Sequence, residues 1–313
     1  MPVDSTAVVL GVLALALAWP VPLVLARAKW PAGAPVLALA LWQSIALAGG
    51  ISMIGSLLLA GLEPFGDDLA SRVSGAAAAV FTGPLPPDVT LLHTFFLSAA
   101  VLLTAHLVLN LALTSVRSRR QRHQHMELLR LLSSPLPDEP ATRIIDHPAP
   151  AAYCLPGARS VTVLSEGMIE LLSPEELEAV IAHERAHLRQ KHHLLLDAFR
   201  SWKRALPWFP IATRAQDAVA LLVEMLADDT ARRTSGDAVL ADAIRIVDST
   251  GSAGTALGAP KDPRTPEQRR TALLAREGRL TADRETVGTG VRLLVVIAIV
   301  LLVVAPPVLV LTS

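Results

Sequence analysis

The chain has 313 residues, of which 52% are hydrophobic and 18% are charged, and its formal net charge at pH 7 is zero. The balanced charge gives no argument for electrostatic attraction of an acidic or a basic partner. A single cysteine, Cys154, excludes an intrachain disulfide framework and suits a reducing compartment, and its expected role is packing in an apolar strand. The high apolar content makes the distribution of the few charges the first question.

Charged side chains are absent from four long stretches of the chain. No Asp, Glu, Lys or Arg occurs within residues 5–26, 31–62, 89–116 and 293–313. Because a helix of about 20 apolar residues crosses the hydrocarbon core of a bilayer, we expect each stretch to be a transmembrane helix. Asp4 stands where a cleaved signal peptide would carry basic residues, so the first stretch is expected to be a permanent span.

Basic residues mark one side of these expected spans. They follow the first and third spans and precede the fourth, whereas the segment between the second and third is acidic. The positive-inside rule then places both termini outside a cell inner membrane and residues 117–292 in the cytoplasm. The run 117–125 predicts contact with anionic lipid headgroups, and no direct nucleic-acid binding is expected. The basic residues are Arg27, Lys29, Arg117, Arg119, Arg120, Arg122, Arg276, Arg279, Arg284 and Arg292.

The predicted architecture is that of a mainly α membrane protein. Residues 1–116 form three transmembrane helices with an extracellular loop at about 61–88, residues 117–290 form a cytoplasmic α+β domain, and residues 291–313 form the fourth transmembrane helix. Prolines are expected to kink the first and fourth spans, and glycines are expected to allow close helix packing in the second. These residues are Pro20, Pro22, Pro306, Pro307, Gly49, Gly50 and Gly55.

Three short apolar segments of the cytoplasmic domain predict strands. They cover residues 143–145, 151–155 and 160–164, and the turn signal Pro156-Gly157 separates the last two. We expect these two to form a hairpin ahead of the next helix. The hairpin is either a structural cover for that helix or an edge that binds an extended peptide by strand addition.

Helix signals follow the predicted strands. The sequence Ser173-Pro174-Glu175-Glu176 combines an N-cap, a proline at the first helical position and a glutamate three residues after the cap. This helix is expected to continue to about Leu206. The remaining expected features are helices at 213–233, at 237–248 and from Thr265 onward, a small-residue loop at 251–260, and Trp208 near the membrane surface.

The most informative motif lies in the first of these helices. His183-Glu184-Arg185-Ala186-His187 has the pattern H-E-x-x-H, and residues four apart share one face of a helix. Both imidazoles can therefore bind one metal ion, and this pattern is typical of zinc peptidases. Glu184 is placed to act as a general base toward an attacking water. The alternative is a surface helix whose histidines are merely solvated.

A catalytic zinc needs a third protein ligand, and Glu224 is the preferred candidate. It stands among apolar residues, where a carboxylate needs a partner, and Asp228 follows four residues later on the same helical face. Asp228 can then accept the second N–H of a ligating histidine and fix its tautomer. Asp197 and Asp217 are alternative third ligands, and Asp229 is the weaker alternative to Asp228.

No spacing selects the residue that would stabilise the transition state. His192, His193, Tyr153 and Arg232 are candidates, although the two histidines are expected to be solvated. A purely structural zinc site would need a fourth protein ligand, and the sequence offers no obvious one.

These features together resemble the BlaR/MecR family of bacterial membrane metallopeptidases and, more distantly, the HtpX-like proteases. The resemblance extends over essentially the whole chain, with four spans and the H-E-x-x-H helix ahead of the last one. The matching segments are 151–157, 172–177, His183-Glu184-x-x-His187 and Glu224-x-x-x-Asp228.

The resemblance implies a zincin-like cytoplasmic domain of the gluzincin type. It implies Zn²⁺ bound by His183, His187 and Glu224, Glu184 as the base in peptide hydrolysis, and a cytoplasmic protein substrate, often a transcriptional repressor. The extracellular penicillin-binding domain of the antibiotic sensors has no counterpart in these 313 residues, so a signal is expected through the spans, the outer loop or a partner. Quality control of membrane proteins and a non-catalytic, zinc-braced signal transducer are the alternative functions.

Overall fold

The computed structural model contains two compact units. One comprises Met1–Leu111, Ser201–Ala215 and Val287–Ser313, and the other comprises Ala112–Arg200 and Gln216–Thr286. The predicted loop at 251–260, Arg284 and Trp208 lie outside the described residues. The structure describes residues 4–83, 85–136, 139–157, 160–207, 210–250, 265–281 and 287–313.

The first unit is helical. Within the described residues, four helical segments are long and apolar enough to cross a membrane, which indicates a membrane-associated protein: Ser5–Arg27, Pro35–Phe65, Leu91–Leu132 and Thr289–Leu311. The elements are α1 (Ser5–Ala18), α2 (Pro20–Arg27), α3 (Trp30–Gly33), α4 (Pro35–Leu62), η1 (Glu63–Phe65), α5 (Leu69–Thr82), α6 (Leu91–Leu132, shared with the second unit) and α13 (Thr289–Leu311).

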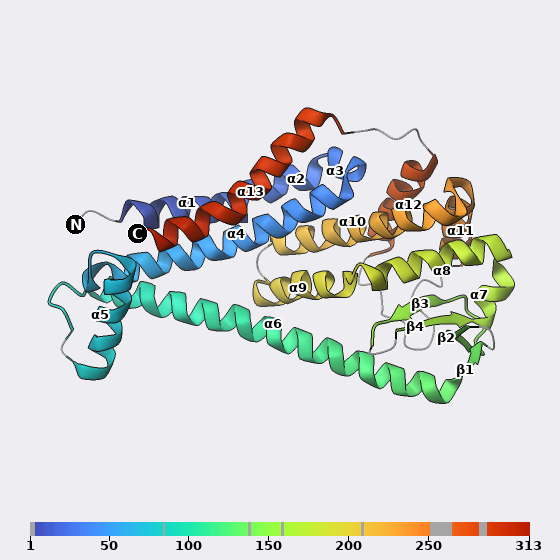
Figure 1. The fold of residues 1–313 in the computed structure, drawn as a ribbon, viewed down its shortest axis with the longest axis horizontal. Helices are drawn as coiled ribbons and strands as arrows, with labels where there is room; N and C mark the ends of the chain where they lie inside the picture. Colours follow the sequence, from blue (N-terminus) through green and yellow to red (C-terminus); the bar gives the residue numbers. More distant parts are fainter. Residues whose placement is uncertain are drawn as a thin grey trace. The chain divides into compact units, whose positions relative to one another are not determined.

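Helices α1, α4 and α13 pack side by side (Figure 1). Gly55 of α4 is part of the reason, because a Cβ at this position would lie 2.6 Å from a methyl carbon of Val310. The prediction of close packing is confirmed for Gly55, whereas Gly50 faces open space. The predicted disturbance of the first span is confirmed as a break, because α1 ends at Ala18 and a new helix begins at Pro20.

The second unit contains a four-stranded mixed sheet in the order β1-β2-β4-β3. Strands β2 and β4 are parallel, and the outer pairs are antiparallel. The predicted hairpin of β3 and β4 is confirmed. Strand β1 is not among the predicted strands, because it contains Pro135, and proline within a segment argues against a strand. The proline is tolerated here because β1 lies at the edge of the sheet. The strands are β1 (Ser133–Leu136), β2 (Glu139–Ile145), β3 (Ala152–Leu155) and β4 (Val161–Ser165).

Helices α8, α10, α11 and α12 share a core of small and aliphatic side chains in the second unit. Its fully buried members are Ala179, Ala231, Leu240, Ala241 and Leu280. Helix α11 packs directly against both α8 and α12, and alanines at such contacts let helix axes approach closely. The helices are α7 (Glu166–Leu171), α8 (Pro174–Arg189), α9 (His192–Ala205), α10 (Pro210–Ser235), α11 (Asp237–Ser249) and α12 (Pro266–Thr281), with α9 and α10 extending into the first unit.

Helix α8 begins as predicted but ends early. The side chains of Ser173 and Glu176 form the reciprocal capping box at its start. The prediction that this helix continues to about Leu206 is wrong, because Lys191 adopts a left-handed backbone conformation with φ of 52°. Helix α8 therefore ends at Arg189, and a separate helix, α9, begins at His192.

Candidate metal centre

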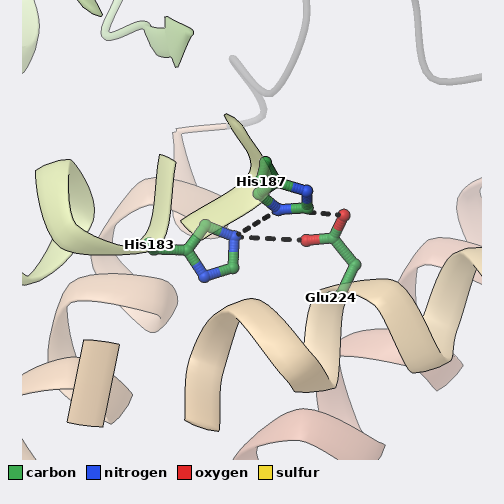
Figure 2. Close-up of side chains that lie close together, drawn as sticks. All are labelled: His183, His187 and Glu224. Carbon is green, nitrogen blue, oxygen red and sulfur yellow. Dashed lines mark hydrogen bonds and ion pairs between the residues drawn. The ribbon is translucent and has the colours of Figure 1, made fainter. Parts of the chain in front are cut away.

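Two histidines of α8 and one glutamate of α10 converge in the second unit. Figure 2 shows the side chains of His183, His187 and Glu224 pointing toward one another. The two Nε2 atoms are 3.1 Å apart. Oε2 of Glu224 lies 3.4 Å from Nε2 of His183, and Oε1 lies 3.7 Å from Nε2 of His187. The structure thus brings together the three residues predicted to be metal ligands.

These separations fit a tetrahedral metal ion. Ligand atoms about 2.0–2.1 Å from Zn²⁺ at tetrahedral angles lie about 3.3 Å from one another, close to the three separations in this cluster. The charges fit as well, because three carboxylates and one guanidinium lie at the cluster, which leaves two negative charges when both imidazoles are neutral. The donor set and its charge therefore suit a divalent cation.

Asp228 and Arg276 form an ionic layer behind these side chains. Oδ1 of Asp228 lies 2.9 Å from Nδ1 of His183, although the N–H of the ring does not point straight at the oxygen. Arg276 of α12 donates two hydrogen bonds of 2.7 Å to the carboxylate of Asp228, and its third nitrogen lies 3.5 Å from Glu224. Asp228 therefore occupies the position predicted for it, beside the histidine that comes first in the motif.

No feature of the sequence selects Arg276. Buried carboxylates at Glu224 and Asp228 require a cation nearby, and this requirement is the one feature from which a basic partner could be expected. Several arginines of α12 satisfy it equally well in the sequence. Only the packing of α12 against α10 shows that Arg276 is the one that reaches them.

The surroundings separate the pKa values of the two histidines. Burial lowers the pKa of His183, but the carboxylates of Asp228 and Glu224 outweigh this effect and raise it to about 10. Burial lowers the pKa of His187 to about 3. Burial also opposes ionisation of Glu224, yet His187, His183 and Arg276 together hold the pKa of its carboxyl group well below the usual range. In the metal-free protein, the cluster therefore attracts positive charge.

Glu184 connects the cluster to the sheet. Burial raises the pKa of Glu184 to about 7, and the backbone N–H of Cys154 in β3 is near enough to act weakly in the opposite direction. Helix α8 also packs directly against β3. The glutamate predicted to be the base therefore lies between the cluster and an edge strand.

The alternative carboxylates are bound elsewhere in the second unit. The buried Asp197 accepts hydrogen bonds from Ser118, Arg122 and Arg200. Asp217 accepts one from Gln268, and Asp229 pairs with Arg279 and Arg232. Among the described residues, the only group with metal-ligand spacing is therefore His183, His187 and Glu224.

The other candidate residues also occupy defined positions. Tyr153 lies in the core between the sheet and α6, where its hydroxyl bonds with His125, and Arg232 pairs with Asp237. The prediction that His192 is solvated is wrong, because only 3% of this residue is exposed. The break at Lys191, which the sequence does not announce, returns His192 to the cluster.

The comparisons with known proteins address the same segment. Residues 116–227 match the model of Peptidase family M48. The match contains α8 and Glu224, and it includes all four strands of the sheet. No curated protein and no solved structure matches the chain. A histidine pair and a glutamate with metal-ligand spacing lie inside this segment, which is similar to that family, and together they support a metallopeptidase function.

Proposed function

We propose that the protein is a zinc endopeptidase anchored in a membrane by its apolar helices. The observation that carries this proposal is the convergence of His183, His187 and Glu224 at tetrahedral spacing, with Glu184 on the next position of the same helix. These three side chains would hold the ion. A zinc ion bound there supplies Lewis-acid polarisation of a carbonyl oxygen and of a water molecule.

Glu184 performs the proton transfers in this proposal. Its carboxylate takes a proton from the attacking water and returns it to the amine that leaves when the peptide bond breaks. Asp228 and Arg276 keep His183 in place during these steps, because Asp228 is buried beside the ring and is ionically paired with the half-buried Arg276.

The edge strand β3 supports a protein substrate in extended form. Strand order β1-β2-β4-β3 leaves one side of β3 without a neighbouring strand of this sheet. An extended segment that adds to this side would use the backbone groups of β3 and would run past α8, which carries Glu184. The substrate is therefore proposed to be a locally unfolded stretch of a protein rather than a compact small molecule.

The basic flanks support a cytoplasmic location for the peptidase domain. Arg117, Arg119, Arg120 and Arg122 follow the apolar part of α6, and Arg292 precedes the apolar part of α13. By the positive-inside rule, these ends of the helices lie at the cytoplasmic face of the inner membrane. We therefore propose a cytoplasmic protein as the substrate, with a transcriptional regulator as the first candidate from the family resemblance.

The test compares three variants of the full-length protein, purified in detergent micelles, on a mixture of peptides derived from a proteome digest. Glu184→Gln is expected to contain as much zinc as the wild type and to cleave no peptide. Glu224→Ala is expected to lose zinc. Glu178→Gln, on the exposed side of the same helix, is the matched control and is expected to cleave at the wild-type rate.

Two outcomes contradict the proposal. Cleavage by Glu184→Gln at the wild-type rate excludes Glu184 as the base. A wild-type protein that holds zinc and cleaves nothing in the digest or in cells favours the non-catalytic transducer. In cells, stabilisation of one regulator by Glu184→Gln supports a signalling protease, whereas stabilisation of many membrane proteins supports quality control.

A further inference from the structure

In each of the two α8 histidines, Nε2 faces the metal centre and Nδ1 contacts another side chain. That side chain is a carboxylate for His183 and a third histidine for His187. Nδ1 of His183 faces the carboxylate of Asp228. Nδ1 of His187 lies 3.0 Å from Nδ1 of His192, the first residue of α9. The two ring planes are nearly perpendicular, at 85°, and the two Nδ1 atoms form a hydrogen bond in which one ring donates and the other accepts.

The hydrogen bonds beyond His192 determine the direction of this contact. Nε2 of His192 lies 2.9 Å from Oε1 of Gln190, which can only accept. His192 therefore carries its hydrogen on Nε2 and presents a lone pair on Nδ1. The next hydrogen bonds agree with this assignment of the Gln190 amide. Its nitrogen donates to the hydroxyl of Thr230, which donates to the carbonyl of Leu226.

The same reasoning assigns the tautomer of His187. Since His192 offers a lone pair, Nδ1 of His187 must carry the hydrogen, and Nε2 of His187 is left with its lone pair. This Nε2 is the atom that faces His183 and Glu224. We propose that His192 is a positioning residue that holds His187 in the tautomer and orientation required to bind the metal ion. This inference rests on the zinc site proposed above.

The break between α8 and α9 makes the contact possible. On a continuous helix, a residue five positions after His187 would be rotated by about 140° from it and would point elsewhere. The left-handed conformation of Lys191 interrupts the helical path, and His192 is buried against His187 instead. Gln190, the exposed residue that caps the end of α8, accepts the hydrogen bond from the other nitrogen of His192.

The test measures zinc affinity of the full-length protein in detergent micelles by competition with a chromophoric chelator. His192→Phe keeps a ring but removes the acceptor, and its zinc affinity is expected to fall by about 10- to 100-fold. His192→Asn places Oδ1 near the former position of Nδ1, and it is expected to restore the affinity to within about threefold of wild type. His193→Phe alters the neighbouring histidine, which faces Arg122 and Asp197, and is expected to have no effect.

A second readout separates positioning from general stability. The visible absorption of the Co²⁺-loaded protein reports ligand geometry, and it is expected to change in His192→Phe and to return to the wild-type spectrum in His192→Asn. The unfolding temperature of the metal-free variants shows that each one is folded. If His192→Phe does not fold, His192→Leu removes the same acceptor with a smaller side chain.

The results distinguish this inference from the proposed function. Wild-type zinc affinity in His192→Phe or His192→Leu overturns the role of His192 alone. Equal loss of affinity in His192→Asn and His192→Phe also overturns it, because the acceptor would then be irrelevant. A wild-type protein that binds no zinc overturns the metal site itself and the positioning role with it.

Discussion

Removal of Arg276 tests the ionic layer behind the cluster. The side chains of Arg276 and Asp228 are 17% and 2% exposed, and two hydrogen bonds of 2.7 Å join them. Removing one partner of a buried ion pair costs about 3–5 kcal/mol, because the other charge is left buried. For a domain of this size, such a loss lowers the unfolding temperature by roughly 10 °C. Arg276→Gln is therefore expected to show a shift of this magnitude.

The assay is thermal unfolding of the metal-free full-length protein in detergent, followed by far-UV circular dichroism. Arg245→Gln is the matched control, because Arg245 is 57% exposed and pairs at the surface with Asp242 and with Glu277. Exposed pairs contribute less than about 1 kcal/mol, so a shift of about 2 °C or less is expected. The double variant Arg276→Gln/Asp228→Asn removes both charges and is expected to recover about half of the loss. Unfolding temperatures of Arg276→Gln and Arg245→Gln within about 2 °C of each other would refute this reasoning.

Two further predictions concern burial and packing. Burial raises the pKa of the Cys154 thiol to about 11. Iodoacetamide at pH 8 should therefore alkylate it on the order of a hundred times more slowly than an exposed thiol, and the rate should rise as the pH approaches 11. Equal alkylation rates in folded and denatured protein would contradict this. Gly61→Ala should destabilise the protein by about 1–3 kcal/mol in a denaturant titration, because its Cβ would lie 2.7 Å from the backbone nitrogen of Leu97. Gly50→Ala is the control, and since nothing lies within 4 Å of its Cβ, it should be neutral or slightly stabilising; equal effects of the two substitutions would exclude close packing as the cause.

The sequence predicts those parts of the structure that depend on local patterns. Helix α8 begins where a capping box and a first-turn proline occur together, and the capping pair Thr265 and Gln268 likewise marks the start of α12. The spacing of His183 and His187 places both rings on one helical face. Glu224 and Asp228 are found by their four-residue spacing in an apolar helix. Each of these inferences uses residues that are close in the chain.

The features that could not be predicted depend on tertiary contacts or on a single backbone angle. Arg276 reaches Asp228 only because α12 packs beside α10, and no spacing encodes that contact. Lys191 is not a glycine, so nothing in the sequence announces its left-handed conformation. The burial of His192 follows from that one angle, which is why a solvated histidine was expected there.

The break at Lys191 has a consequence for how related sequences should be compared. Because residues 190 and 191 belong to neither helix, an insertion or deletion between Arg189 and His192 would change where the first residue of α9 lies relative to His187. The H-E-x-x-H pattern would remain unchanged in the alignment, yet His187 would lose its hydrogen-bond acceptor. The length of this connection is therefore a better criterion than the five-residue pattern for judging whether a homologue retains a tightly held ion.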